Sequence, residues 1–395
     1  MSSFQALMVS TASRVGTGNI IGVSVAICMG GYGAVFWMWL IAIIGSASAF
    51  IESTLAQIYK KKGEHGSYGG PAYYIHVWAE RKRKKPLRRS VAAVLFALSG
   101  LICWCGISQV VSNSVSSAFK NAFHIPPIAT TVALVVLAAV IVLRKNATVK
   151  SLDVIVPVMA VCYFVMTLYV IATNITHLPA VLGSIFSEAF GLRQVAAGGF
   201  GAVLMNGIKR GLYSNEAGIG SAPNAAASAD VSHPAKQGLV QMLSVFIDTI
   251  LICSSTAFMI LCTNLDASAY VDAAGNTMNA AYIQDSLVAN FGPAGSVFIT
   301  VALTLFAFTT LVGNYFYAEM NISYLYPKAT KNKPFMLFYR LLAAVIIFMG
   351  AQFSAGLAWD LADVLMGIMA LINVPSCLIM GKTACKALAD YRKQK

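Results

Sequence analysis

Charged residues are scarce in this sequence. Only 11% of its 395 residues are Asp, Glu, Lys or Arg, and 58% are hydrophobic, whereas ordinary soluble domains carry about 25% charged residues. A water-soluble globule would need more polar surface to cover its core, and a disordered chain would need higher net charge and lower hydrophobicity. A transmembrane barrel is disfavoured because the apolar stretches lack the alternation of barrel strands. We therefore predict a polytopic, all-α membrane protein.

Acidic residues and histidines are also few. The chain has 15 acidic residues, 5 histidines and 28 Lys or Arg residues, which gives a net charge of +13. In a soluble chain this excess would suggest nucleic acid as a partner. In a membrane chain it indicates basic cytoplasmic loops, so we expect a lipid bilayer and no nucleic acid. Nearly all of the eight cysteines fall in apolar runs, and we predict no disulfide framework, metal cluster or cofactor.

Ten apolar stretches are long enough to cross a bilayer, for which about 20 residues suffice. They cover residues 4–29, 33–59, 91–119, 128–143, 152–173, 195–211, 238–262, 295–324, 335–353 and 359–380. The connections are predicted to be loops: a basic segment (60–89), a loop with His177 and Pro179, a small-residue segment (212–236) and a polar excursion (264–291). We predict one transmembrane domain over residues 1–395, with no separate soluble domain and no cleavable signal peptide.

The basic residues favour one orientation of these ten spans. If the segment 60–89 is cytoplasmic, the Lys- and Arg-rich parts of 144–150, 209–236, 328–333 and 382–395 fall on the same side. The opposite side then receives only Lys120 and Arg193. Because basic residues gather in cytoplasmic loops, we predict that both termini are cytoplasmic.

Two spans carry glycines where a membrane helix should be continuous. The first contains Gly16, Thr17, Gly18 and Asn19, and the sixth has glycines within 196–202. Unwound backbone in lipid leaves polar groups unpaired and is tolerated only where it lines a cavity or binds a solute. Close helix packing is the alternative reason for membrane glycines.

Matching positions of the two interruptions favour solute binding. Spans one and six correspond if the chain consists of two five-helix halves, 1–176 and 177–395. Five spans per half give the halves opposite orientations, and interrupted helices at matching positions of inverted repeats indicate a transporter's substrate site.

Polar residues inside other spans add candidates. Thr309 and Thr310 are hard oxygen ligands of the kind that small cations prefer, although a bond back to their own helix is the alternative. Glu52 and Glu319 either pair with basic residues or act at a gate. Asp248 is predicted to join a buried polar network.

Several long strings resemble one family of transporters. They cover residues 15–23, 30–39, 69–75, 210–223, 233–249 and 306–315. The last string contains the pair Thr309 and Thr310 and the sequence Gly-Asn-Tyr at 313–315. These strings are similar to those of the alanine/glycine:cation symporters, also called sodium:alanine symporters. The resemblance runs from Phe4 to the tenth span. It implies the leucine-transporter fold, with two inverted five-helix repeats and a central site between broken helices one and six.

The resemblance also implies the function and the site. It implies sodium-coupled uptake of small neutral amino acids across the bacterial inner membrane. The unwound Gly16, Thr17 and Gly18 would hold the substrate carboxylate, with Asn19 beside it. The substrate pocket is expected to include Ala197, Gly199, Phe200 as an aromatic lid, Gly201 and Asn314. Sodium is expected to bind the carbonyls of Ala12, Val15 and Phe306 and the hydroxyls of Thr309 and Thr310.

The chain departs from the family pattern at three points. Asn314 stands where many members carry Trp, which suits a larger or more polar pocket and keeps glutamine open as a substrate. Arg14 places a fixed cation beside the expected sodium, with Glu52 or Glu319 as possible partners. Members usually have a peripheral helix ahead of the first broken one, and this chain starts almost directly at the broken helix.

Other functions fit the sequence less well. A proton-coupled transporter needs a carboxylate relay, for which Asp248 alone is thin support. A channel usually needs oligomeric symmetry around a pore. The segment from Ser214 to Gly218 lacks a His or Cys partner for catalysis, so we interpret it as a cytoplasmic loop that repacks during gating and predict no enzyme activity.

Overall fold

The computed structural model describes residues 2–63, 66–143, 145–191, 200–263, 265–272, 277–278, 280–329 and 332–394. Within these residues the chain is almost wholly helical, with one short hairpin in which β1 (Lys61–Gly63) pairs antiparallel with β2 (Gly66–Tyr68). Seven described helices are long and apolar enough to cross a membrane, and a bent helix pair adds an eighth candidate. The prediction of an all-helical, multi-pass membrane protein is confirmed at this level.

The first half of the chain follows the predicted spans closely. Its elements are α1 (Ser3–Arg14), the π-helical η1 (Gly18–Gly22), α2 (Val23–Gly30), α3 (Gly33–Ile58), α4 (Pro71–Arg83), α5 (Val91–Phe123), α6 (Pro127–Leu143) and α7 (Lys145–Thr173). The segment from α1 to α2 is the bent pair, with an angle of 49°. The predicted interruption of the first span is therefore confirmed.

The second half contains more elements than predicted. They are α8 (Leu178–Ala189), α10 (Phe200–Asn215), α11 (Pro223–Ser228), α12 (Pro234–Val245), the π-helical η2 (Phe246–Cys253), α13 (Ser254–Leu261), the 3₁₀ turn η3 (Ala267–Tyr270), α14 (Ala281–Phe291), α15 (Pro293–Leu325), α16 (Lys333–Gly350) and α17 (Ala355–Lys393). The segments α12, η2 and α13 form one continuous span.

All four connections that we predicted to be loops contain a helix, namely α4, α8, α11 and α14. In α8, Pro179 lies in the first turn, where its missing N–H removes no helical hydrogen bond. In α14, Tyr282, Ile283 and Leu287 are buried on one face. Both segments are too short to span a bilayer, and an apolar face against the rest of the protein explains why they are helical.

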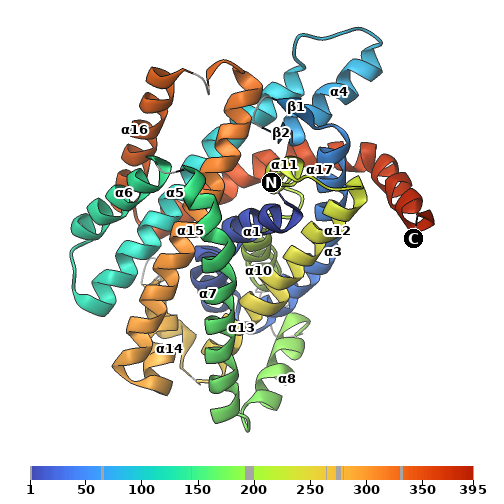
Figure 1. The fold of residues 1–395 in the computed structure, drawn as a ribbon. Helices are drawn as coiled ribbons and strands as arrows, with labels where there is room; N and C mark the ends of the chain where they lie inside the picture. Colours follow the sequence, from blue (N-terminus) through green and yellow to red (C-terminus); the bar gives the residue numbers. More distant parts are fainter. Residues whose placement is uncertain are drawn as a thin grey trace.

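The helices pack around the bent N-terminal pair (Figure 1). α3 contacts α10 and α12, and α5 contacts α15, α16 and α17. α4 and the hairpin lie at the upper end of the view, whereas α8 and α14 lie at the lower end. Outward-facing valines of α6 and α7, including Val132, Val136, Val158 and Val161, are about half exposed or more, as expected for surfaces covered by lipid.

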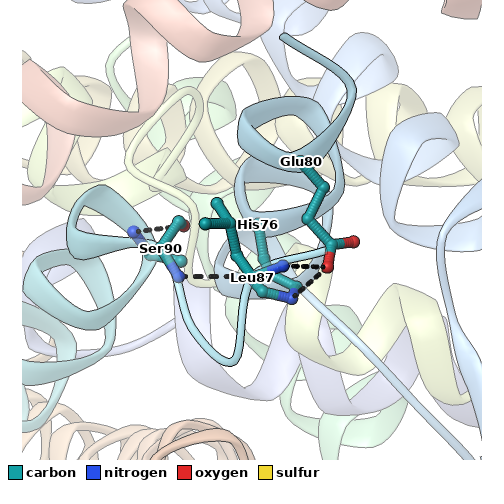
Figure 2. A network of polar contacts seen from close by, with 5 residues as sticks. His76, Glu80, Leu87 and Ser90 are labelled. Carbon is teal, nitrogen blue, oxygen red and sulfur yellow. Dashed lines mark hydrogen bonds and ion pairs between the residues drawn. The ribbon is translucent and has the colours of Figure 1, made fainter. Parts of the chain in front are cut away.

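Figure 2 shows how the basic segment after α3 is tied to the helical bundle. The Ser90 N–H donates to His76 Nδ1 at 3.1 Å, and the Leu87 N–H donates to Glu80 Oε1 at 3.0 Å. His76 Nε2 lies 3.5 Å from the same Glu80 oxygen. These bonds fix α4 against the start of α5, so part of this predicted loop is an ordered helix.

Candidate functional site

The first interruption begins where α1 ends. Val15 has φ −73° and ψ 91°, an extended conformation, and its N–H still donates to Thr11 O at 2.7 Å. The next N–H, that of Gly16, donates instead to the side chain of Asn19 at 2.8 Å. Asn19 thus supplies the acceptor that the broken helix no longer offers, as buried backbone groups require.

Close approach explains why glycines occupy this interruption. A Cβ on Gly16 would overlap the Thr310 hydroxyl, and a Cβ on Gly18 would lie 2.8 Å from the Tyr213 ring. Both distances are too short for any larger residue without movement of the neighbouring element. The two glycines therefore let α15 and α10 contact the unwound backbone directly.

Oxygen atoms of α1 and α15 converge at the same point. Thr310 Oγ1 lies 3.4 Å from Ala12 O and 3.3 Å from Ser13 O, and it donates to Phe306 O at 2.9 Å. Thr309 Oγ1 also donates to Phe306 O, at 2.9 Å. The structure brings these predicted residues together and adds the carbonyl of Ser13.

The alternative interpretation of the threonines also has a basis in the structure. Both hydroxyls bond back to the carbonyl of Phe306 in their own helix. The Thr310 hydroxyl additionally faces the carbonyls at the end of α1. Among the described residues, the Thr309 hydroxyl forms its hydrogen bond with Phe306 O alone. Val15, the fifth predicted residue, is buried at the start of the interruption.

A second interruption inside the bundle separates α10 from α11. Between Asn215 and Pro223 the chain has positive φ angles at Glu216 (52°), Gly218 (82°) and Gly220 (94°). This segment is buried, although we predicted a cytoplasmic loop there. The two glycines and Pro223, a residue suited to a helix start, were the signal that sequence reasoning passed over.

The predicted interruption at 196–202 falls mostly outside the described residues. Ala197 and Gly199 are among those not described. Phe200 begins α10, and Gly201 lies in its first turn, exposed and with no atom near its missing Cβ. The described part of this region is regular helix, and a buried interruption lies about 20 residues further along, at 216–222.

Glu216 joins the two interruptions. Its Oε1 accepts a hydrogen bond from Ser13 Oγ at 2.9 Å, and its Oε2 accepts one from Ser221 Oγ at 2.5 Å. Ser13 is the residue whose carbonyl faces Thr310. Glu216 is therefore a direct link between the two interruptions.

Glu52 and Asn373 hold the centre of the second interruption. The Gly218 N–H donates to Glu52 Oε1 at 3.3 Å, and Asn373 Nδ2 donates to Gly218 O at 2.9 Å. Asn373 Nδ2 also donates to Glu52 Oε2 at 2.8 Å, and the Tyr74 hydroxyl donates to Asn373 Oδ1. This cluster ties α3, α4 and α17 to the peptide groups on both sides of Gly218.

The prediction of a buried polar network around Asp248 is confirmed. Asn19 Nδ2 donates to Asp248 Oδ1 at 2.7 Å, and Ser214 and Thr249 donate to its Oδ2 at 2.8 and 2.9 Å. Asn19 lies in η1 and Asp248 in η2, so the bond joins two π-helical segments. Such segments often occur at functional sites.

Arg14 is buried beside the first interruption. Its Nη1 donates to the backbone and side-chain oxygens of Gln241, each at 3.3 Å, while Nε and Nη2 have no hydrogen-bond partner. The recorded hydrogen bonds therefore go to α12 and not to Glu52 or Glu319, the partners suggested by the sequence. Arg14 interacts electrostatically with Glu52, Glu216 and Asp248.

A small cavity lies between the second interruption and the long helices. Its volume is about 20 Å³, which is enough for a water molecule but not for an amino acid. Asn314, a predicted substrate residue, lies at its wall and donates to Thr310 O at 3.0 Å. The polar residues of the wall include Glu216, Ser221, Asn224, Asn314, Tyr317 and Asn321.

A cationic and aromatic cluster covers the other side of the unwound backbone. Arg210 pairs with Asp363 and lies over the Trp359 ring, with its guanidinium carbon 4.4 Å from the ring centroid. Tyr213 packs on the same ring at 4.6 Å between centroids. The hydroxyls of Tyr213 and Thr17 are buried and interact with each other beside the unwound backbone.

Comparison with known proteins identifies the family. The model of the sodium:alanine symporter family matches residues 1–395. The chain belongs to the sodium:alanine symporter family. The predicted resemblance is thereby confirmed, and this family member is a transporter and not an enzyme. No group of His, Cys, Asp and Glu suited to a metal ion occurs among the described residues.

Relatives match this symporter over its full length. It is 45% identical over 397 residues to the probable sodium/glutamine symporter GlnT of Bacillus subtilis, covering all of this chain and 79% of GlnT. It is 36% identical over 400 residues to the sodium/alanine symporter AgcS of Methanococcus maripaludis, covering all of this chain and 85% of AgcS. These relatives bear out the prediction of a sodium-coupled amino-acid symporter.

Solved structures share the fold of this symporter. A manganese transporter of Eremococcus coleocola aligns with a TM-score of 0.62 at 12% identity, covering 96% of this chain and 78% of that one. MhsT in complex with L-phenylalanine aligns with a TM-score of 0.54 at 15% identity, covering 97% and 99%. These neighbours are transporters of the leucine-transporter fold, which confirms the predicted fold class at this level.

Proposed function

We propose that this symporter imports a small neutral amino acid of the alanine and glycine class together with sodium. The convergence of α1 carbonyls and the Thr310 hydroxyl at an unwound backbone is the observation that carries the proposal. Ion and substrate each favour the conformer that binds the other, and this coupling lets the sodium gradient drive uptake.

The sodium ion would bind at the end of α1. The carbonyls of Ala12 and Ser13 and the Thr310 hydroxyl are neutral, hard oxygens, which suit a small monovalent cation. Carbonyls at the C-terminal end of a helix also carry partial negative charge. Val15, Phe306 and Thr309 complete the proposed set, as predicted.

The substrate carboxylate would bind at Gly16, Thr17 and Gly18. The neighbouring Thr17 and Tyr213 hydroxyls support this position, because both are buried donors that a carboxylate there could accept from. Asn19 would act indirectly, since its side chain already holds Gly16 and Asp248. We propose that the rest of the substrate faces the segment 216–222.

The wall residue Asn314 would help to select the substrate side chain. The cavity beside it must widen for any amino acid to enter, which an alternating-access cycle provides. Its polar wall supports glutamine as a further substrate. A pocket contribution from Ala197, Gly199, Phe200 and Gly201 stays a prediction.

We further propose that residues 1–176 and 177–395 form two inverted five-helix repeats. A short helix follows the second long span of each half: α4 follows α3, and α14 follows α13. The two short helices lie at opposite ends of the molecule in Figure 1, as inversion requires. With the basic end cytoplasmic, both termini face the cytoplasm of a bacterial inner membrane.

Proton coupling is a second candidate. YrbD of Bacillus subtilis, named a putative sodium/proton-dependent alanine carrier protein, is 45% identical to this chain over 408 residues. The described bundle also holds the buried carboxylates Glu52, Glu216 and Asp248. These groups offer more than the single relay residue that the sequence suggested.

Uptake of alanine into proteoliposomes tests the proposed function. An inward sodium gradient should drive alanine accumulation, and replacement of sodium by potassium should abolish it. Thr310→Val should raise the sodium concentration for half-maximal uptake by about tenfold or more, through loss of roughly 1.4 kcal/mol or more of ion binding.

The matched control for this experiment is Thr304→Val. Thr304 lies in the same helix, and its hydroxyl bonds only back to Thr300 O, at 2.7 Å. Its sodium dependence should match that of the unmodified protein. Gradient-independent uptake, or equal effects of both substitutions, would contradict the proposal.

A further inference from the structure

The buried charges around the two interruptions do not balance. Arg14 is 1% exposed, Glu52 and Asp248 are fully buried, and Glu216 is 3% exposed. Arg14 interacts electrostatically with all three carboxylates. One guanidinium against three carboxylates leaves two negative charges in excess, and an uncompensated buried charge is costly. A single sodium ion would neutralise only one of them.

Two of the three carboxylates have strong local compensation. Asp248 accepts hydrogen bonds from the side chains of Asn19, Ser214 and Thr249, all within 2.9 Å. Glu216 accepts bonds from Ser13 and Ser221 and is joined through Ser13 to the proposed sodium oxygens. Sodium at that position is therefore linked to Glu216 through Ser13.

The negative charge of Glu52 has the fewest and weakest stabilising partners of the three carboxylates. Its only hydrogen bonds are a long one from the Gly218 N–H, at 3.3 Å, and one from the Asn373 amide, at 2.8 Å. Both donors are neutral, and no cation forms a recorded salt bridge with Glu52 in the described part of the chain. The Tyr74 hydroxyl donates to Asn373 and not to the carboxylate.

The titratable groups around Glu52 come from four elements. Arg14 of α1, Glu216 of the second interruption, Tyr74 of α4 and Cys377 of α17 all interact with it electrostatically. Only Arg14 among them is a cation, and Glu216 and Asp248 share it. The carboxylate of Glu52 is thus where an additional positive charge is needed.

We propose that Glu52 binds a proton, which is carried as a second coupling cation with each sodium and amino acid. The inference rests on the proposed function and deepens it. The proton comes from water on the outer side, forms an O–H bond at the carboxylate, and leaves to water on the cytoplasmic side, with no change in oxidation state.

The position of Glu52 links this proton to the conformational change. A proton on Oε1 would occupy one of its lone pairs and remove the carboxylate charge, so the bond from the Gly218 N–H, already long at 3.3 Å, would weaken. Binding of the proton thus loosens the contact between the segment 216–222 and α3. Release of the proton restores the stronger bond.

Glu52→Gln in proteoliposomes tests the proposal. With the unmodified protein, alanine uptake driven by sodium should acidify the lumen, as read by a trapped pH dye, and move charge in a solid-supported membrane recording. The variant should retain sodium-driven alanine uptake without acidification, and the charge moved per alanine should fall by about one elementary charge. Glu188→Gln, on the half-buried α8, is the matched control and should leave both readouts unchanged.

A measurement on the unmodified protein covers the case in which the variant does not fold. Calorimetry of alanine binding in sodium, in two buffers of different ionisation enthalpy, counts the protons taken up. Proton uptake that rises as the pH is raised from acidic toward neutral supports the proposal, because the carboxylate is then unprotonated before binding.

The outcomes separate the two proposals. Sodium-driven uptake without luminal acidification and without proton uptake on binding overturns the proton at Glu52 and leaves the symporter standing. Unchanged acidification in Glu52→Gln also overturns it, as does an excess charge carried by a second sodium. Loss of sodium dependence in the unmodified protein would overturn the proposed function itself.

Discussion

Gly16 lies where no side chain fits. The Thr310 hydroxyl of α15 occupies the position that a Cβ would take, and Thr310 in turn faces the carbonyls of Ala12 and Ser13. A single missing methyl group therefore allows the contact on which the proposed ion site depends. At the scale of the residue, the composition of the first interruption follows from this steric requirement.

Gly16→Ala should weaken sodium binding and lower stability. The added methyl group must displace Thr310 or the end of α1, at a typical overpacking cost of about 1–3 kcal/mol. Sodium-dependent thermal stabilisation of the purified protein measures the effect, and we expect it to be largely lost.

Gly183→Ala is the matched control for this substitution. Gly183 lies within α8 with no atom near its missing Cβ, so alanine should be neutral or slightly stabilising. An equal loss of sodium-dependent stabilisation in both variants would contradict this account.

At the scale of the element, one side chain joins the two π-helical segments η1 and η2. Asn19 of η1 donates to Asp248 of η2, accepts from the Gly16 N–H, and its own carbonyl accepts from Thr256 at 2.6 Å. Each bond satisfies a group that a regular helix would have paired internally. The first interruption is therefore stable only against the span that contains η2.

Asn19→Ala should destabilise the protein markedly. It leaves the Gly16 N–H without its acceptor and removes a donor from Asp248, and each buried unpaired group costs about 1–3 kcal/mol. We expect a clear fall in the apparent melting temperature in detergent together with loss of alanine uptake. Asn206→Ala is the control, because the exposed Asn206 bonds only to Ala202 O of its own helix; equal effects of the two would refute this account.

At the scale of the whole molecule, a buried ion pair links α10 to α17. Arg210 pairs with Asp363, and Lys209 lies 3.9 Å from the same carboxylate. Trp359 of α17 covers both Arg210 and Tyr213. The contact closes one side of the unwound backbone, so it must open if substrate enters from that side.

Removal of one partner should be worse than removal of both. Arg210→Met leaves Lys209 as the remaining cation beside Asp363, and Asp363→Leu leaves the Arg210 guanidinium buried without its carboxylate. Breaking a buried ion pair typically lowers the free energy of unfolding by about 3–5 kcal/mol, and the loss should be smaller here because Asp363 is partly exposed. Thermal unfolding of the two single variants and the double variant measures the coupling. Additive effects would show that the pair does not act as a unit.

The sequence alone determined the class of protein, the positions of most spans and the first interruption. These features are local or compositional: apolar length marks a span, and adjacent Gly, Thr and Asn residues at mid-depth mark an unwound helix. The threonine pair and the family strings are also readable residue by residue. The placement of Thr310 near the end of α1, which the family resemblance implied, agrees with the structure.

Only the tertiary structure decided where the second interruption lies and which residues meet there. Glycines in a membrane span are compatible with close helix packing and with an unwound turn, so composition alone did not indicate the interruption at 216–222. Likewise, Gln241, Ser13 and Asn373, which bond to Arg14, Glu216 and Glu52 respectively, each lie more than 100 residues away in the chain. No local pattern encodes such pairs, because they exist only when separate helices pack around one buried centre.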